Sequence, residues 1–185
     1  MRQENRLYGI LEFVRSIAWY ILLAFLFVAF FFRPMQISGT SMTPALLDGE
    51  HVMINIIHNL ISEPDRFDIV VVKHADEMWV KRVIGLPNET LSYKDGKLYV
   101  DGEMIEETFL DETYMKETCE RLSIDEFNGD TLEVSLGEDE FFLIGDNRPE
   151  SLDSRNTRIG AFHRDDIIAN GVFVFWPLNE MGYIG

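Results

Sequence analysis

Short runs of apolar or alternating apolar and polar residues, separated by turn residues, make up most of the chain after residue 33. Alternation with a period of two is typical of strands that bury one face. The predicted strands are Met35–Ser38, His51–Ile57, Phe67–Lys73, Met78–Ile84, Lys97–Val100, Thr131–Leu136, Glu140–Ile144 and Ile167–Phe175. Many short strands with frequent turns favour a mainly β fold of coiled antiparallel sheets that is partly barrel-like.

Turn residues and one helical segment complete this pattern. Asp95-Gly96, Asp101-Gly102 and Asn128-Gly129 predict tight hairpin turns, because these residue types adopt positive φ angles readily. Residues 110–122 predict one short helix. The stretch at about 101–130 fits no strand pattern, and we interpret it as a variable acidic lobe on the sheets.

The longest apolar segment lies near the N-terminus. Ile17–Phe32 holds sixteen residues without a charge or a polar amide, and Ser16 extends it to seventeen, the short end of the length that crosses a bilayer. A helix of a soluble protein would show a polar face, and a cleaved signal peptide would end in a small-x-small site. This run has neither feature, so we predict an uncleaved transmembrane helix over residues 16–33.

Basic residues set the predicted orientation of this helix. Arg2, Arg6 and Arg15 precede the apolar segment, whereas only Arg33 follows it closely. Because positive charge stays on the cytoplasmic side, residues 1–15 are predicted to be cytoplasmic, and residues 34–185 to form a domain outside the plasma membrane. The lipid bilayer is then one partner of this single-pass chain.

The net charge of −16 argues against nucleic acid as a partner, because phosphate contacts need Lys and Arg. Residues 101–140 carry fifteen acidic and two basic residues, which gives −13 of that total, and we interpret most of this charge as solvated. No calcium-loop motif appears, Cys119 is the sole cysteine, and the four histidines lack metal-ligand spacing. The sequence therefore predicts no metal and no cofactor.

One segment contains a serine in a setting suited to catalysis. Ser41 lies in Ser38-Gly39-Thr40-Ser41-Met42-Thr43-Pro44, where Gly39 permits a bend and Pro44 forbids a regular central strand. A serine exposed on such a bend can attack a carbonyl group, and its own backbone N–H can stabilise the oxyanion. The same residue types also make ordinary loops, and the segment alone does not separate these two interpretations.

A second segment contains a lysine that should be buried. Lys81 lies in the strand-like run Trp79-Val80-Lys81-Arg82-Val83-Ile84-Gly85-Leu86-Pro87, and alternation puts Trp79, Lys81 and Val83 on one face. Dehydration lowers the pKa of a lysine, and a neutral amine can serve as the base that a serine nucleophile needs. The alternative is a lysine whose stem covers apolar surface while its ammonium group reaches water.

A third segment, residues 145–155, is dense in polar side chains and follows the predicted strand Glu140–Ile144. It fits an ordinary surface turn. It also fits a hydrogen-bonded scaffold in which Asp146 and Asp153 pair with Arg82, Arg148 or Arg155.

Together these segments resemble the bacterial type I signal peptidases, in their compact form with a single span. The resemblance lies in the N-terminal anchor, Ser-Met-x-Pro at 41–44, Lys-Arg-Val-Ile-Gly-Leu-Pro at 81–87, Gly-Asp-Asn-Arg-x-x-Ser-x-Asp-Ser-Arg at 145–155 and Phe-Trp-Pro at 175–177. It covers most of the chain and is weakest across 88–140. It implies a membrane-anchored serine endopeptidase that removes signal peptides from exported preproteins through a Ser/Lys dyad and an ester acyl-enzyme.

The resemblance also implies a role for each matching residue. Ser41 would be the nucleophile and Lys81 the general base, while Ser151 would orient the lysine amine and Gly145 would leave room beside it. Ion pairs among Arg82, Asp146, Asp153 and Arg155 would brace the site. The signal peptide would bind in an extended form between two short segments, Met35, Gln36, Ile37 and Ser38 on one side and Met78, Trp79 and Val80 on the other. The oxyanion region would comprise Gly39, Thr40 and Ser41.

One position departs from the family pattern. Gly39 stands where some members place a serine whose hydroxyl joins the oxyanion hole, so the backbone N–H of Ser41, or a donor from Ser38 or Thr40, must take that part. Two other functions fit parts of the same sequence. One is a self-cleaving Ser/Lys protease like the LexA-like repressors, against which the predicted anchor speaks, and the other is a non-enzymatic, membrane-tethered β domain.

Overall fold

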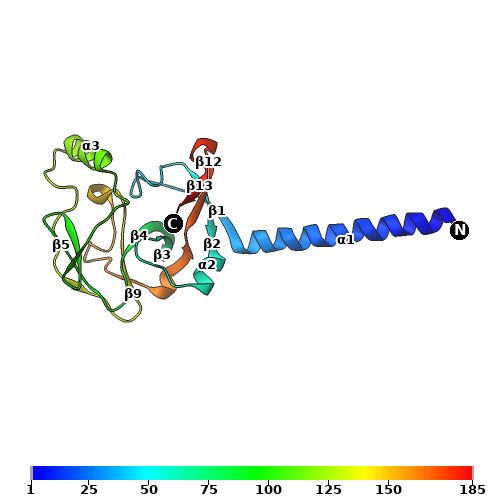
Figure 1. The fold of residues 1–185 in the computed structure, drawn as a ribbon, viewed down its shortest axis with the longest axis horizontal. Coiled ribbons are helices and arrows are strands. Elements are labelled where there is room, and N and C mark those ends of the chain that lie inside the picture. Colours follow the sequence, from blue (N-terminus) through cyan, green and yellow to red (C-terminus); the bar gives the residue numbers. More distant parts are fainter. Residues whose placement is uncertain (1, 185) are drawn as a thin grey trace. The chain divides into compact units, whose positions relative to one another are not determined.

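The computed structural model describes the backbone of residues 2–184, and the side chains in that range except those of 2–8, 10, 27–31, 57, 58 and 60. The chain divides into two compact units, Met1–Arg33 and Pro34–Gly185. The helices and short 3-10 turns are α1 (Arg2–Phe31), α2 (Ile56–Ile61), α3 (Glu112–Leu122), η1 (Arg148–Glu150), η2 (Arg164–Asp166) and η3 (Leu178–Glu180) (Figure 1).

Helix α1 takes up the N-terminal apolar run. From Ile17 to Leu26 each side chain is apolar and exposed. Within the described side chains, no helix combines the length and the apolar character that crossing a lipid bilayer requires. The side chains of 27–31, which belong to the predicted span over 16–33, lie outside the described residues.

The second unit is mainly β, as the pattern predicts, and is built from three sheets. Their strand orders are β1-β2-β12-β13, β10-β9-β4-β3-β11 and β7-β6-β5-β8. The pairings among β2 to β13 are antiparallel. The strands are β1 (Phe32–Gln36), β2 (His51–Asn55), β3 (Ile69–His74), β4 (Glu77–Gly85), β5 (Thr90–Lys94), β6 (Lys97–Val100), β7 (Glu103–Ile105), β8 (Val134–Ser135), β9 (Glu140–Ile144), β10 (Phe162–His163), β11 (Ile167–Asn170), β12 (Val172–Trp176) and β13 (Gly182–Ile184).

The five-stranded sheet is apolar on both faces around its central pair, β3 and β4. Successive side chains of a strand point to opposite faces, so Ile69 and Val71 join one buried cluster while Val70 and Val72 join another. This burial explains why residues 69–72 form a continuous apolar run rather than an alternating one. Lys81 lies on β4 within this sheet, opposite Val70 of β3.

Two of the three predicted hairpin turns are present. Asp95-Gly96 joins β5 to β6 and Asp101-Gly102 joins β6 to β7, with positive φ angles at all four residues, as a two-residue turn of this type requires. The prediction of a hairpin at Asn128-Gly129 is wrong. The Asn128 side chain is buried and its amide donates to the Gly96 carbonyl oxygen at 3.0 Å, so long-range contacts decide its conformation.

Several element boundaries also differ from the sequence pattern. The predicted strand Ile167–Phe175 is two strands, because Gly171, with φ of +77°, separates β11 from β12 and lets them join different sheets. The run predicted as a strand over His51–Ile57 changes to helix α2 at Ile56. The helix predicted over 110–122 is α3, whose first turn is capped by the Asp111 carboxylate. The weakly patterned strands β5, β7, β10 and β13 escape prediction.

Candidate active site

One cavity of about 410 Å³ holds the two residues proposed for the dyad and the predicted substrate-binding residues, whereas the predicted supporting residues Gly145, Ser151, Arg82, Asp146, Asp153 and Arg155 do not line it. Both Ser41 and Lys81 line it. The other lining residues come from the end of β1 and the turn that follows, from β4, from the last residue of η1 and from Leu152 after it. Its lining residues are Met35, Gln36, Ile37, Ser38, Gly39, Thr40, Ser41, Met42, Met78, Trp79, Val80, Lys81, Glu150 and Leu152.

Ser41 begins a tight turn that follows β1. The Thr43 N–H donates to the Thr40 carbonyl oxygen at 3.1 Å, which closes the turn around Ser41. Gly39 has φ of +94°, a conformation that residues with side chains adopt only with strain, and its N–H donates to the Asp48 carboxylate at 2.8 Å. The backbone therefore favours glycine at this position over the serine that some family members carry.

Lys81 is held on β4 with 3% of its surface exposed. Its Nζ donates to Ser151 Oγ at 3.2 Å and lies 5.7 Å from the centre of the Trp79 ring. Burial lowers the pKa of Lys81 from 10.5 to about 8, because the charged form loses its hydration. Asp153 acts to raise the pKa and Arg155 to lower it, but burial is the largest of these effects.

Gly145 lies where no side chain fits. A Cβ atom there would overlap with Ser151 Oγ and with the Ser41 carbonyl oxygen, and would lie 2.7 Å from Ser151 Cβ. Glycine thus lets the turn at Ser41 and the loop that carries Ser151 approach each other. The packing agrees with the role that the family resemblance implies for this residue.

Two buried ion pairs lie behind the cavity, and both follow the predicted pairing. Arg82 donates to both carboxylate oxygens of Asp146, at 2.8 and 2.6 Å, and Arg155 donates to both oxygens of Asp153, at 2.8 Å each. Such forked pairs fix geometry as well as charge. Burial acts to raise the pKa of Asp153, but hydrogen bonds from Arg155 and from the Gly145 N–H outweigh it and the pKa is lowered. Asp153 therefore stays anionic at neutral pH.

None of these groups is arranged as a metal site. Among the described residues, no group of three or more His, Cys, Asp or Glu side chains is placed to hold a metal ion. The polar chemistry of the cavity is that of hydroxyl, amine and carboxylate groups.

Comparison with known proteins identifies the family of this chain. The family model described as signal peptidase, peptidase S26, matches residues 10–176. The chain belongs to this family. The resemblance to type I signal peptidases inferred from four short motifs is thereby confirmed.

Two named relatives match nearly the full length. Signal peptidase I S of Bacillus subtilis (strain 168) is 37% identical over 183 residues, which cover 98% of each chain. Signal peptidase I T of the same strain is 39% identical over 173 residues, 92% of this chain and 88% of that one. A crystal structure of a signal peptidase I from Enterococcus faecalis V583 is 30% identical, with a TM-score of 0.48, and covers 60% of this chain and 97% of that chain.

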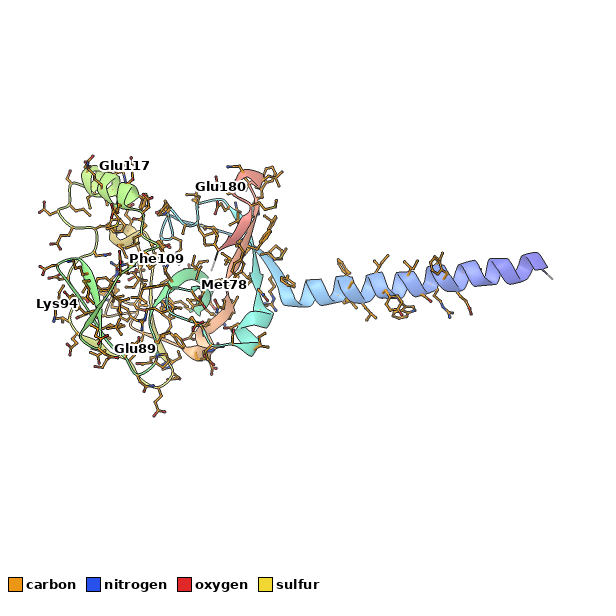
Figure 2. The ribbon with its side chains drawn as sticks, in the orientation of Figure 1. Met78, Glu89, Lys94, Phe109, Glu117 and Glu180 are labelled. Atoms are coloured by element: carbon orange, nitrogen blue, oxygen red, sulfur yellow. The ribbon has the colours of Figure 1, made fainter. Side chains whose placement is uncertain are left out.

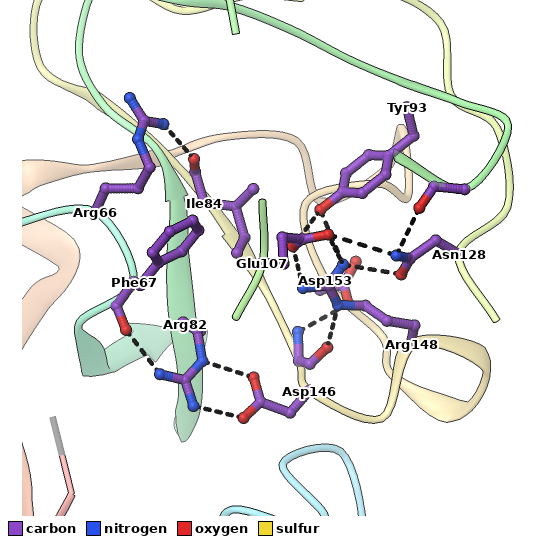
Figure 3. Close-up of polar contacts among 12 residues, drawn as sticks. Arg66, Phe67, Arg82, Ile84, Tyr93, Glu107, Asn128, Asp146, Arg148 and Asp153 are labelled. Carbon is purple, nitrogen blue, oxygen red and sulfur yellow. Dashed lines mark hydrogen bonds and ion pairs between the residues drawn. The ribbon is translucent and has the colours of Figure 1, made fainter. Parts of the chain in front are cut away.

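In this signal peptidase chain, one buried cluster behind the 145–155 loop was not predicted. Arg148 has 2% of its surface exposed, and its guanidinium donates to Glu107, to the Tyr93 hydroxyl and to Asn128 Oδ1 (Figure 3). Its Nε also donates to the Gly145 carbonyl oxygen at 3.1 Å. Arg148 thus pairs with Glu107 rather than with the aspartates proposed for it.

This cluster corrects the interpretation of the acidic stretch. Glu107 comes from the stretch expected to be solvated, yet its side chain is only 6% exposed and forms an ion pair with Arg148. The nearby Phe109 is partly buried, and the centre of its ring lies 4.1 Å from the guanidinium carbon of Arg82 (Figure 2). Part of the acidic stretch therefore supports the 145–155 loop through Arg148, whereas residues such as Glu117 on α3 are exposed. Composition alone carries no signal that separates the two kinds of residue.

Replacing Glu107 with glutamine is expected to lower the free energy of unfolding by about 3–5 kcal/mol, because the Arg148 charge would stay buried without its anion. The urea midpoint of the full-length protein in detergent measures this. Glu106→Gln, at the adjacent exposed carboxylate, should change the value by less than about 0.5 kcal/mol. Adding Arg148→Met to Glu107→Gln should restore part of the loss, and equal midpoints for the Glu106 and Glu107 variants would contradict this role.

Proposed function

We propose that this chain is a membrane-anchored serine endopeptidase that removes signal peptides from exported preproteins, with Ser41 as nucleophile and Lys81 as general base. The observation that carries the proposal is the burial of Lys81 in the wall of the cavity that Ser41 also lines, with a pKa lowered to about 8. At neutral pH about a tenth of such an amine is uncharged, and this fraction grows as the pH rises. A lysine with ordinary solvation would supply almost no free base at that pH.

The reaction follows from these groups. Neutral Lys81 takes the proton of the Ser41 hydroxyl as Oγ bonds to the carbonyl carbon before the scissile bond. Negative charge gathers on the carbonyl oxygen and is stabilised by the Ser41 N–H. The Lys81 ammonium then gives its proton to the amine nitrogen, the C–N bond breaks, and the mature chain leaves with a new N-terminus.

The second half of the reaction returns the enzyme to its starting state. The signal peptide stays attached to Ser41 as an ester. Lys81, now neutral, takes a proton from a water molecule whose oxygen attacks the ester carbon, and then returns that proton to Ser41 Oγ as the ester bond breaks. Ser151, which contacts Lys81 Nζ, would hold the amine in line for both transfers.

Strand β4 supports the proposed binding of an extended substrate. Its residues 77–82 pair with β3 on one side, but its pairing with β9 on the other side begins only at Arg82. Within the described strands, the second edge of β4 at Met78–Val80 is therefore free to accept a further strand, and these residues line the cavity together with Met35–Ser38. Small pockets there would select small side chains at the first and third positions before the cut, as the small-x-small signal requires.

The apolar run at 16–33 supports the anchoring part of the proposal. Ile17–Leu26 present only apolar, exposed side chains on α1, and the basic residues at 2, 6 and 15 precede them. We place the N-terminus in the cytoplasm and residues 34–185 outside the plasma membrane on this charge asymmetry. Anchoring would bring the cavity to a substrate that is itself held in the bilayer.

Cleavage of a purified preprotein tests the proposal. Full-length wild-type protein in detergent should release the mature chain, and sequencing of the new N-terminus should place the cut after a small-x-small segment. Ser41→Ala should release none while keeping the same circular dichroism spectrum. Incubating wild-type protein alone tests the alternative of a self-cleaving Ser/Lys protease, because such a protease would shorten itself. Equal rates for wild type and Ser41→Ala would contradict the proposed nucleophile.

A further inference from the structure

Asn147 donates three hydrogen bonds, and two of them join the 145–155 loop to the turn at Thr40–Thr43. It is buried, with 1% of its surface exposed. Its backbone N–H donates to the Ser41 carbonyl oxygen at 3.0 Å, and its side-chain Nδ2 donates to the Thr40 carbonyl oxygen at 3.1 Å and to Glu150 Oε2 at 3.0 Å. Two consecutive carbonyl groups of the turn are therefore held by one residue.

The bond to Thr40 bears directly on the oxyanion. The Thr40 carbonyl and the Ser41 N–H belong to the same peptide unit, and in a planar trans peptide these two groups point in opposite directions. Fixing the carbonyl oxygen thus fixes the direction of the N–H. Within the described residues that N–H donates to no acceptor, and Ser41 lines the cavity.

The neighbouring position offers no substitute donor. Gly39 has no side chain, and its N–H is already bound to the Asp48 carboxylate at 2.8 Å. In our proposal the Ser41 N–H therefore supplies more of the oxyanion stabilisation than in a relative with a serine hydroxyl at this place, with the Ser38 and Thr40 hydroxyls as the other donors that line the cavity. Its orientation matters correspondingly more, since a preorganised donor needs no rearrangement when the charge forms.

The contacts of the Asn147 side chain involve its two amide hydrogens and not its carbonyl oxygen. Asn147 Oδ1 is buried and accepts no hydrogen bond from the described residues, although an unsatisfied buried acceptor is costly. Both amide hydrogens, in contrast, have partners. Glu150 of η1 accepts one of these two amide hydrogens. Its Oε2 also accepts a hydrogen bond from Arg121 Nη2 of α3 at 2.7 Å, and α3 lies beside η1 (Figure 1).

We propose that Asn147 is a positioning residue that aims the Ser41 N–H at the oxyanion. The inference rests on the proposed function and adds a residue to it. Asn147 touches neither substrate nor Lys81 in this account, and acts through the Thr40–Ser41 peptide. Its removal should therefore impair the chemical step more than substrate binding.

The test is steady-state cleavage of a preprotein by Asn147→Ala in the full-length protein. Removing an oxyanion donor costs about 10²–10³ in kcat. Here the donor remains, and the Thr40 carbonyl oxygen keeps its bond from the Thr43 N–H at 3.1 Å but loses the one from Asn147 Nδ2. The Thr40–Ser41 peptide is then held less firmly, so we expect kcat to fall about 10- to 100-fold, with KM within about threefold of wild type. The pH of half-maximal rate should stay at the wild-type value, because Lys81 and its surroundings are unchanged.

Asn59→Ala is the matched control. Asn59 is also a buried asparagine with an unpartnered Oδ1, and its Nδ2 donates to a backbone carbonyl oxygen, that of Ile167, at 2.7 Å, but it does not line the cavity. Its loss should lower the thermal midpoint and leave kcat within about twofold. Asn147→Leu, which has a similar shape and removes the donor without adding a charge, serves if Asn147→Ala does not fold.

The outcomes separate this inference from the function it rests on. A wild-type chain that cleaves no preprotein overturns the proposed function. If wild type is active, three results overturn only the role of Asn147: kcat within threefold in a folded Asn147 variant, a loss expressed in KM alone, or an equal fall of kcat in Asn59→Ala. A shifted pH of half-maximal rate would also overturn it, because the variant would then act through Lys81.

Discussion

Lys81→Met is expected to be almost inactive and yet more stable than wild type at neutral pH. Loss of the general base should lower kcat by about 10²–10⁴-fold, since no other described group that lines the cavity is a buried amine. Stability should rise for a separate reason. Dehydration of the Lys81 ammonium lowers the free energy of unfolding of the wild-type protein. A methionine of similar length packs in the same place without a charge.

The pKa of Lys81 sets the size and the pH range of this gain. Its value of about 8 in the folded chain against 10.5 for a free lysine corresponds to about 3 kcal/mol of lost stability wherever the amine is charged in both states. Between pH 8 and 10.5 the unfolded chain binds more protons, so wild-type stability should rise with pH across that window. Below pH 8 the penalty is present in full.

Urea unfolding at pH 7 and pH 10 measures the effect. The Lys81→Met variant should unfold at a higher urea concentration than wild type at pH 7, and the difference should shrink at pH 10. Lys97→Met, on an exposed strand position remote from the cavity, is the control and should change neither activity nor midpoint by a measurable amount. A Lys81→Met protein less stable than wild type at pH 7 would contradict the buried, dehydrated amine.

Gly145→Ala is expected to cause the second largest loss of activity. The added methyl group would collide with Ser151 Oγ and with the Ser41 carbonyl oxygen, both of them backbone or short, stiff groups that cannot swing away. A displacement of about 1 Å between nucleophile and base costs on the order of 10² in rate, so kcat should fall by at least about that factor. Overpacking should also lower the free energy of unfolding by about 1–3 kcal/mol.

Preprotein cleavage by Gly145→Ala and by Gly129→Ala separates this effect from a general intolerance of alanine. A Cβ atom at Gly129 would meet no atom within 4 Å, and its backbone conformation is open to other residues. Gly129→Ala should therefore keep wild-type kcat and stability. Wild-type kcat in Gly145→Ala would mean that the Ser41 turn and the Ser151 loop do not need their close approach.

Much of the β framework follows from local pattern. Strands β6 and β9 match the predicted ranges, because each alternates or is fully apolar between clear turn residues, and Asp95-Gly96 fixes the β5–β6 hairpin. Strand β5 was missed, since Thr90–Lys94 has too few apolar residues to stand out. It is stabilised by its neighbours β6 and β8 rather than by its own composition.

In the candidate site, too, residues in local motifs were predicted, and residues placed by long-range contacts were not. Ser41, Lys81 and the Arg82–Asp146 pair belong to motifs that are readable in the sequence, and the structure gathers them at or behind one cavity. The ion pair of Glu107 could not be predicted from the sequence. Glu107 is one of many acidic residues in its stretch, and its partner Arg148 lies 41 residues further along the chain. The bonds from Asn147 to the Thr40 and Ser41 carbonyl oxygens could not be predicted either, because backbone carbonyl groups of a distant turn leave no trace in the sequence.

The central claim, a neutral Lys81 amine facing Ser41, is tested most directly by titrating that amine. The chain has five lysines, and the four others are exposed, so full-length protein with isotope-labelled lysine gives few NMR signals and four internal references. Lys81→Met assigns the remaining signal by its disappearance. We predict that the Lys81 signal shifts with a midpoint near pH 8. A midpoint at 10 or above would contradict the proposed dyad.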